Sequence, residues 1–170
     1  MKKFLVGSLC AITFLAIVLA AYLGLGFMDV AADQRPSARE AGFMTASLEA
    51  SVRRRAPQMQ NPLASSDDTL IAGGKLYLND CVGCHGEPGQ PPSDFGATFY
   101  PPAPQFPSAG TQFSEAQTFW VAKNGIRMTG MSPQGSSYSD SQLWSLAAFI
   151  SRVRNLPPAV VKAIRPPPSK

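Results

Sequence analysis

The stretch Cys81-Val82-Gly83-Cys84-His85 decides how the rest of this 170-residue sequence is interpreted. Two cysteines three residues apart can lie on one helical turn, so both thiols can form thioethers with the vinyl groups of a haem. The histidine that follows is then held next to the iron as an axial ligand. The stretch therefore predicts one covalently attached haem c, with Cys81, Cys84 and His85 as cofactor-binding residues and His85 as a metal ligand.

Two other kinds of site use the same residue types. A thioredoxin-like Cys-x-x-Cys motif requires a flanking βαβ pattern, and the sequence has no run of alternating strand residues. A structural zinc site needs four ligands, usually cysteine or histidine. The chain has three cysteines and one histidine, and Cys10 lies inside an apolar stretch. Haem attachment is the interpretation that fits these residues.

A helix of about three turns is predicted to lead into Cys81. It begins at Asp67-Asp68, because acidic residues stabilise a helix N-terminus, and apolar residues follow at helical spacing. Gly73 and Gly74 in its interior each cost about 1 kcal/mol relative to alanine. We explain them by a second helix that crosses closely at that point.

Two further helices carry capping-box signatures, in which a serine and a glutamine three residues later satisfy free backbone N–H groups. The first helix ends at Asn124-Gly125, a typical C-cap pair, and the second covers about residues 140–153. Segments 86–110 and 125–138 are rich in loop-forming residues and are predicted to be irregular. The signatures are Ser114 with Gln117 and Ser139 with Gln142.

An apolar stretch from Phe4 to Met28 contains no charged side chain and follows two lysines. A helix of this length, at about 1.5 Å per residue, exceeds the roughly 30 Å hydrocarbon core of a bilayer. The lysines at its short end predict that the N-terminus stays in the cytoplasm. A cleaved signal peptide, with a cleavage site at Val30-Ala31-Ala32, is the alternative. Its apolar region is usually only about 7–15 residues long, so a retained anchor is favoured.

The expected fold is all-α: a small helical haem domain preceded by a single transmembrane helix. We expect an anchor (or an uncleaved signal-like segment) at 1–28 and a spacer at 29–66 with a short amphipathic helix around 38–55. The haem domain covers 67–154, and an extended Pro-rich tail covers 155–170. The spacer helix is expected to lie on the haem domain or on the membrane.

The formal charge of +4 does not lie on the haem domain. Residues 67–154 hold seven acidic and five basic residues, a net charge of −2. The positive surplus lies at Lys2 and Lys3, in the run Arg53-Arg54-Arg55 and in the tail. The Arg run is typical of a solvated or lipid-headgroup-facing patch. No basic, aromatic-interleaved groove indicates nucleic-acid binding.

The candidates for the second iron ligand are reduced by elimination. His85 is the only histidine, so two histidine ligands from one chain are impossible. A methionine thioether raises the reduction potential and suits electron transfer. Four of the six methionines belong to the anchor or the spacer, which leaves Met128 and Met131. The turn-forming residues Gly130 and Pro133 favour Met131, with Met128 as a packing residue, but the residues alone leave both candidates open.

The stretch from Gly73 to Arg152 resembles a class I c-type cytochrome of the bacterial monohaem kind that is attached to membranes or to larger redox complexes. The family often continues Gly-Met-Pro, whereas this chain has Met131-Ser132-Pro133. The resemblance is carried by Gly74, Tyr77, the stretch Cys81 to Gly86, Asn124-Gly125-Ile126, Thr129-Gly130-Met131 and Trp144.

The resemblance implies that Met131 is the second axial ligand and that the first and last helices of the domain cross near Gly73 or Gly74 and Tyr77. It places Tyr77 among the cofactor-binding residues. It also implies that a backbone carbonyl in the Pro101-Pro102 stretch, taken as Pro102, accepts the free ring N–H of His85. The alternative is that these prolines only stiffen the loop.

The function implied is transfer of single electrons between redox protein partners by a domain on the periplasmic side of a bacterial inner membrane. No catalytic residues are expected, because the sole histidine is used and no carboxylate pair forms a site motif. Neither a small-molecule substrate nor nucleic acid is expected. One alternative is a haem-based sensor or small haem enzyme with an open iron position. Another is a fixed cytochrome subunit of a dehydrogenase or terminal oxidase.

Overall fold

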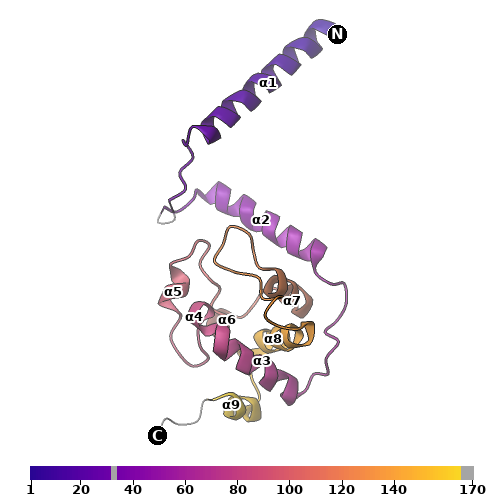
Figure 1. Ribbon diagram of the computed structural model, residues 1–170, viewed down its shortest axis with the longest axis vertical. Coiled ribbons are helices and arrows are strands. Elements are labelled where there is room, and N and C mark those ends of the chain that lie inside the picture. Colours follow the sequence, from indigo (N-terminus) through magenta and orange to yellow (C-terminus); the bar gives the residue numbers. More distant parts are fainter. Residues whose placement is uncertain (32–33, 166–170) are drawn as a thin grey trace. The chain divides into compact units, whose positions relative to one another are not determined.

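The computed structural model describes residues 1–31 and 34–165, and within these ranges all regular structure is helical (Figure 1). The all-α expectation is confirmed. The chain divides into two compact units, one of residues Met1–Arg35 and one that begins at Pro36.

The first unit contains helix α1 (Lys2–Gly24). Its apolar part has a mean hydropathy of 2.6, and none of it is buried against the protein. By length and composition α1 can cross a membrane, although a signal sequence has the same properties. The alternative cleavage site at Val30-Ala31-Ala32 extends outside the described residues at Ala32.

The core of the second unit is formed by α3 (Asp67–Asp80), α7 (Glu115–Asn124) and α8 (Asp140–Arg152). Helix α8 packs against both of the others and buries eight consecutive residues, 143–150. Two aromatic pairs join the three helices: Tyr77 with Phe149, ring centroids 5.3 Å apart, and Phe119 stacked on Trp144 at 4.3 Å.

The glycines of α3 lie where other helices approach most closely. A Cβ atom on Gly73 would lie 2.0 Å from the backbone oxygen of Ser145 in α8. One on Gly74 would lie 2.9 Å from Ile164 and from Phe149. Only glycine leaves room for such approaches. The expected crossing of α3 and α8 near Gly73, Gly74 and Tyr77 is confirmed.

The ends of α7 and α8 follow the predicted capping residues, whereas the cap of α3, Ser66, was not predicted. Ser66 caps α3 by accepting a hydrogen bond from the backbone N–H of Thr69, and Asp67 and Asp68 occupy the first turn. Capping boxes begin α7 and α8 as expected, and Gly125 ends α7 with φ at +66°. The segment 86–110, expected to be irregular, contains two one-turn helices, α5 (Asp94–Ala97) and α6 (Phe106–Ala109).

Helix α2 (Ala38–Arg55) matches the predicted spacer helix and packs on α7. The expectation of an extended tail is wrong for residues 158–164, which form α9 (Pro158–Ile164). Proline is well suited to the first turn of a helix because its fixed φ matches and its missing N–H is not needed there. Val160 and Ile164, four residues apart, are buried, and α9 packs on α3. The proline run 166–168 lies outside the described residues.

Candidate functional site

The Cys-x-x-Cys-His stretch forms a tight turn at the end of α3. Cys81 ends α3, and the one-turn helix α4 (Val82–His85) follows directly. The backbone N–H of His85 donates to the carbonyl of Cys81 at 2.9 Å, which closes the turn. Cys81 and Cys84 are both half-buried free thiols. Burial raises the pKa of Cys81 to about 12, with a smaller contribution from the neighbouring Asp80, so this thiol is neutral.

His85 is held by a backbone carbonyl and an aromatic ring. Its Nδ1 lies 2.9 Å from the carbonyl oxygen of Pro104, and Phe106 stacks on it with ring centroids 4.6 Å apart. Because a carbonyl can only accept, Nδ1 carries the proton and donates it. Burial lowers the pKa of His85, against the opposing effect of the Pro104 hydrogen bond, and thus favours the neutral ring. The lone pair is then on Nε2, the atom free to bind a metal.

The acceptor for His85 is therefore Pro104, and the assignment of Pro102 is wrong. Pro102 is exposed, and the backbone N–H of Ala103 donates back to the carbonyl of Gly96 at 2.9 Å. The proline segment therefore comes within hydrogen-bonding distance of His85 only at Pro104, the residue that follows Ala103. The residue type was predicted correctly, but its position depends on the path of the loop.

Tyr77 holds the backbone that follows the motif. Its side chain is fully buried in α3, and its hydroxyl donates to the carbonyl of Gly86 at 2.6 Å and lies 3.2 Å from that of His85. Burial raises the pKa of Tyr77, so the hydroxyl stays protonated and remains a donor. Tyr77 therefore fixes where α4 ends.

A second brace, which the sequence did not reveal, acts on Cys84. The side-chain amide of Gln105 donates to the carbonyl of Cys84 at 2.9 Å and accepts from the backbone of Ser93 at 2.7 Å. A Cβ atom on Gly96 would lie 1.9 Å from the same carbonyl of Cys84. The available signal was weak: Gln105 is a lone amide side chain in a Pro-rich segment.

Met131 lies in a tightly bonded loop after α7. Its carbonyl accepts from the backbone of Ile126 at 2.9 Å, and its own N–H donates to the hydroxyl of Thr129 at 3.1 Å. A Cβ atom on Gly125 would lie 2.6 Å from the Met131 carbonyl, so glycine is required there. The Met131 residue is half-buried.

Met128 is not a packing residue, contrary to expectation. It is 92% exposed and has φ at +60°, the left-handed conformation that non-glycine residues seldom adopt. The Met128 side chain therefore lies in solvent and not in the core. Of the two candidate methionines, only Met131 is even partly buried.

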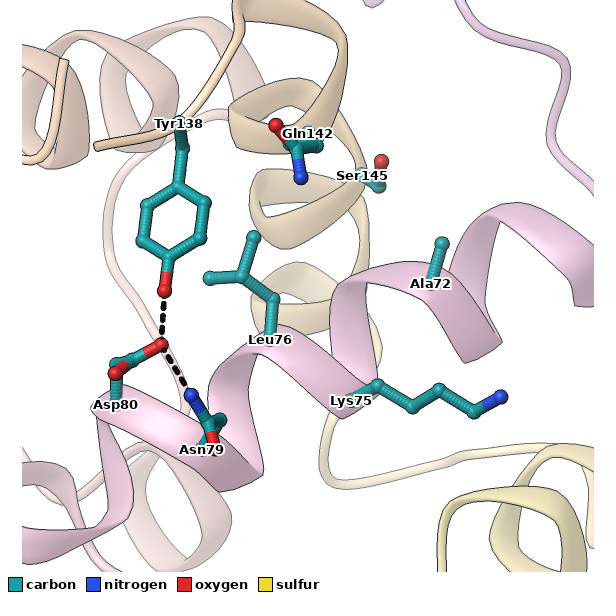
Figure 2. Close-up of a pocket in the computed structure, with 8 residues that line it drawn as sticks. All are labelled: Ala72, Lys75, Leu76, Asn79, Asp80, Tyr138, Gln142 and Ser145. Atoms are coloured by element: carbon teal, nitrogen blue, oxygen red, sulfur yellow. Dashed lines mark hydrogen bonds between the residues drawn. The ribbon is translucent and has the colours of Figure 1, made fainter. Parts of the chain in front are cut away.

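Two contacts tie the Met131 loop to the rest of the site. A Cβ atom on Gly130 would lie 2.7 Å from the ring of Phe99, so the Met131 loop packs on the loop that supplies Pro104. At its other end, the Tyr138 hydroxyl is hydrogen-bonded to the carboxylate of Asp80, next to Cys81, as Figure 2 shows. Tyr77, Cys81, Cys84 and His85 thus come together, while Met131 is supplied by a separate loop that contacts this group's supporting segments.

Residues 68–150 match the family model described as cytochrome c oxidase, cbb3-type, subunit III. These residues are a c-type cytochrome domain. Comparisons with curated proteins and with solved structures gave no match. A c-type cytochrome domain carries covalently attached haem c with iron, and it exchanges electrons with redox protein partners.

The residues of the cytochrome domain fit this cofactor. Haem c requires two free thiols on one turn and a neutral imidazole with an available nitrogen, and Cys81, Cys84 and His85 supply them. The zinc alternative fits poorly: in residues 1–31 and 34–165, no group of three or more His, Cys, Asp or Glu side chains converges as a metal site. Methionine is not among these residue types, so this absence has no bearing on Met131 as an iron ligand.

Proposed function

We propose that this chain is a membrane-anchored cytochrome with one haem, which carries single electrons between protein partners on the periplasmic side of a bacterial inner membrane. The c-type cytochrome domain supports electron transfer. Helix α1 supports the anchor, because 23 apolar-rich residues are enough to span a bilayer. The lysines that precede the apolar stretch support the orientation.

In this proposal Cys81 and Cys84 would hold the haem through thioethers, and Nε2 of His85 and the thioether sulfur of Met131 would bind its iron. The 2.9 Å contact between Nδ1 of His85 and the Pro104 carbonyl is the single observation that carries this proposal, because it leaves Nε2 free. The partial burial of Met131, compared with the 92% exposure of Met128, supports the choice of methionine.

When bound, the haem supplies one-electron chemistry at iron, and a His/Met pair sets a higher reduction potential. The protein then has only to keep the ligand atoms in place. Pro104 and Phe106 fix the orientation of the His85 ring, and Tyr77 fixes the backbone on which that ring is mounted. No proton has to move, because the Nδ1 proton of His85 stays in its bond to Pro104. We therefore propose an electron carrier without a catalytic residue.

The matched family model is named for a subunit of a cytochrome c oxidase. We propose by analogy that the domain serves a larger membrane-bound redox complex, either as a fixed subunit or as a tethered carrier. A retained anchor suits this role, because confinement to the membrane raises the effective concentration of the haem near its partner.

The optical spectrum of the reduced, haem-loaded full chain with and without carbon monoxide tests the ligand set. Two protein ligands leave no open iron position, so the expected spectrum does not change when carbon monoxide is added. A clear shift would mean an open or easily displaced position. That result would favour the alternative of a haem-based sensor or small haem enzyme.

A further inference from the structure

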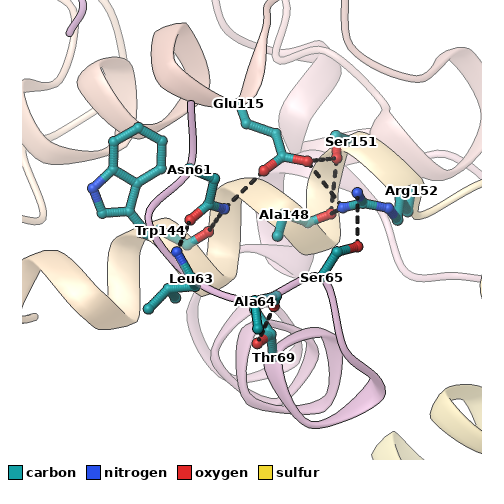
Figure 3. Close-up of polar contacts among 10 residues, drawn as sticks. All are labelled: Asn61, Leu63, Ala64, Ser65, Thr69, Glu115, Trp144, Ala148, Ser151 and Arg152. Atoms are coloured by element: carbon teal, nitrogen blue, oxygen red, sulfur yellow. Dashed lines mark hydrogen bonds and ion pairs between the residues drawn. The ribbon is translucent and has the colours of Figure 1, made fainter. Parts of the chain in front are cut away.

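Helix α2 is a fixed part of the cytochrome unit. Its Val52 is fully buried, and Ala56, the residue that follows the end of α2, is 5% exposed. Helix α2 packs on α7. The chain between α2 and α3 is also held: the Asn61 amide donates to Glu115 at 2.7 Å and to the carbonyl of Trp144 at 3.1 Å (Figure 3). The orientation of α2 relative to the Cys-x-x-Cys-His turn is therefore set by the fold.

The face of α2 opposite Val52 carries an exposed apolar side chain with arginines on both sides. Phe43 precedes Val52 by about two and a half helical turns and so lies on the other side of the helix. It is 72% exposed, and its neighbour Met44 is 57% exposed. Arg39 lies about one turn before Phe43 and Arg54 about three turns after it, so both share its face. We call this surface the Phe43 face.

The charge of α2 is opposite to that of the core helices. It contains four arginines and two glutamates, a net charge of +2, whereas residues 67–154 carry −2. Arg53, Arg54 and Arg55 are all exposed, and in the part of the chain that the structure describes none of them forms an ion pair. An apolar residue flanked by arginines on an exposed helix suits a lipid surface with anionic headgroups.

We propose that the Phe43 face lies on the anionic surface of the bilayer that α1 spans, with Phe43 at the headgroup boundary. This inference rests on the proposed anchor. The connector between the two helices, residues 25–37, could reach at most about 45 Å even if fully extended. The bilayer surface is therefore the largest surface within constant reach of α2. The contact sets one side of the cytochrome domain against the membrane and leaves the others available to partners.

The test is photocrosslinking at position 43. The haem-loaded full chain carrying Phe43→p-benzoylphenylalanine is placed, one chain per disc, in lipid nanodiscs of phosphatidylcholine with phosphatidylglycerol or of phosphatidylcholine alone. After irradiation, mass spectrometry identifies what is attached to residue 43. We expect lipid adducts, severalfold more abundant in the discs with phosphatidylglycerol. Lys162→p-benzoylphenylalanine, on the exposed side of α9, is the matched control and should form no adduct.

The charge dependence is tested with two triple variants. Arg53→Gln, Arg54→Gln and Arg55→Gln together should abolish the preference for phosphatidylglycerol. Lys75→Gln, Lys162→Gln and Arg165→Gln remove the same charge from exposed positions outside α2 and should leave it intact.

Three results would overturn the proposal. They are no adduct at position 43, a protein–protein adduct at that position in native membranes, and equal lipid adducts at positions 43 and 162. A chain that does not remain with the nanodisc would instead contradict the anchor itself. The failure of this inference and the failure of the proposed function are thus distinguishable.

Discussion

At the scale of single residues, two oxygen acceptors determine where the histidine of the motif lies. The Pro104 carbonyl fixes the ring of His85, and the Gly86 carbonyl, held by Tyr77, fixes the end of the turn. Both acceptors belong to the backbone, so neither can be replaced by mutation of its own side chain. The donor to Gly86, the Tyr77 hydroxyl, can be removed by mutation.

Tyr77→Phe should lower the free energy of unfolding of the haem-loaded protein by about 1–3 kcal/mol, because it leaves a buried carbonyl without its donor. The ring contact with Phe149 is retained, so the loss of stability measures the contribution of the Tyr77 hydroxyl group. Guanidinium denaturation followed by circular dichroism gives the value. Tyr100→Phe, at a side chain that is 42% exposed, is the control and should change stability little. Equal stability of Tyr77→Phe and the parent protein would contradict this role.

Met131→Ala should open an iron position, so the reduced protein should bind carbon monoxide and its reduction potential should fall. Met128→Ala is the matched control in the same loop. Because Met128 is 92% exposed, this variant should keep both the parent spectrum and the parent potential. A spectroelectrochemical titration measures both quantities. If the Met128 variant changed and the Met131 variant did not, the ligand assignment would be reversed.

At the scale of helices, the contact between α3 and α8 depends on the absence of a side chain at Gly73. Gly73→Ala would bring a Cβ atom to 2.0 Å from a backbone oxygen that cannot move independently of α8. We expect a loss of about 1–3 kcal/mol or more in the free energy of unfolding. Gly42→Ala in α2 has no atom within 4 Å and should be neutral or stabilising. Thermal unfolding of both variants provides the comparison.

The connector between α2 and α3 depends on Asn61, whose side chain also accepts from the backbone N–H of Leu63 at 3.0 Å. Asn61→Ala should speed hydrogen exchange at the Leu63 amide more than at the Leu70 amide inside α3, because only the former loses its acceptor. Asn79→Ala is the control, since the Asn79 side chain donates to its exposed neighbour Asp80 in α3 and not to the segment between α2 and α3. Unchanged exchange at Leu63 would show that other contacts hold the connector.

The helices that the sequence predicted were those whose signals are local. The capping boxes at Ser114 and Ser139 and the glycine after Asn124 act within one helical turn, and they placed α7 and α8 correctly. Helix α9 was missed because Pro157-Pro158 indicates an extended chain unless the apolar residues that follow have a surface to cover. That surface, on α3, exists only in the folded protein.

Within the site too, features with a local sequence signal were predicted, and features that depend on the folded chain were not. The ligand-bearing turn follows from five consecutive residues. The support of His85 by Pro104, and of Cys84 by Gln105, depends on the route of a 25-residue loop that carries no periodic pattern. Met128 is exposed and has a left-handed backbone conformation, and the residue type reveals neither.

At the scale of the whole molecule, the proposed anchor predicts that the chain keeps its N-terminal segment. Mass spectrometry of the protein purified from membranes should show that the chain retains residues 2–28 and carries one haem. The protein should also resist extraction by alkaline carbonate, as a spanning helix does. The mass of a chain that begins near residue 32 or 33 would indicate a cleaved signal peptide. Release of the protein by carbonate would indicate the same.

Helix α8 also determines the order of events while the protein is being made. Synthesis proceeds from the N-terminus, so α3 and the two cysteines are complete before α8 has been translated. Until then α3 lacks its main packing partner, because α8 supplies half of the residues of the buried core cluster. Each new chain therefore passes through an interval in which both thiols are present and the core around them cannot yet close. Haem attachment during this interval would not require any packed helix to open.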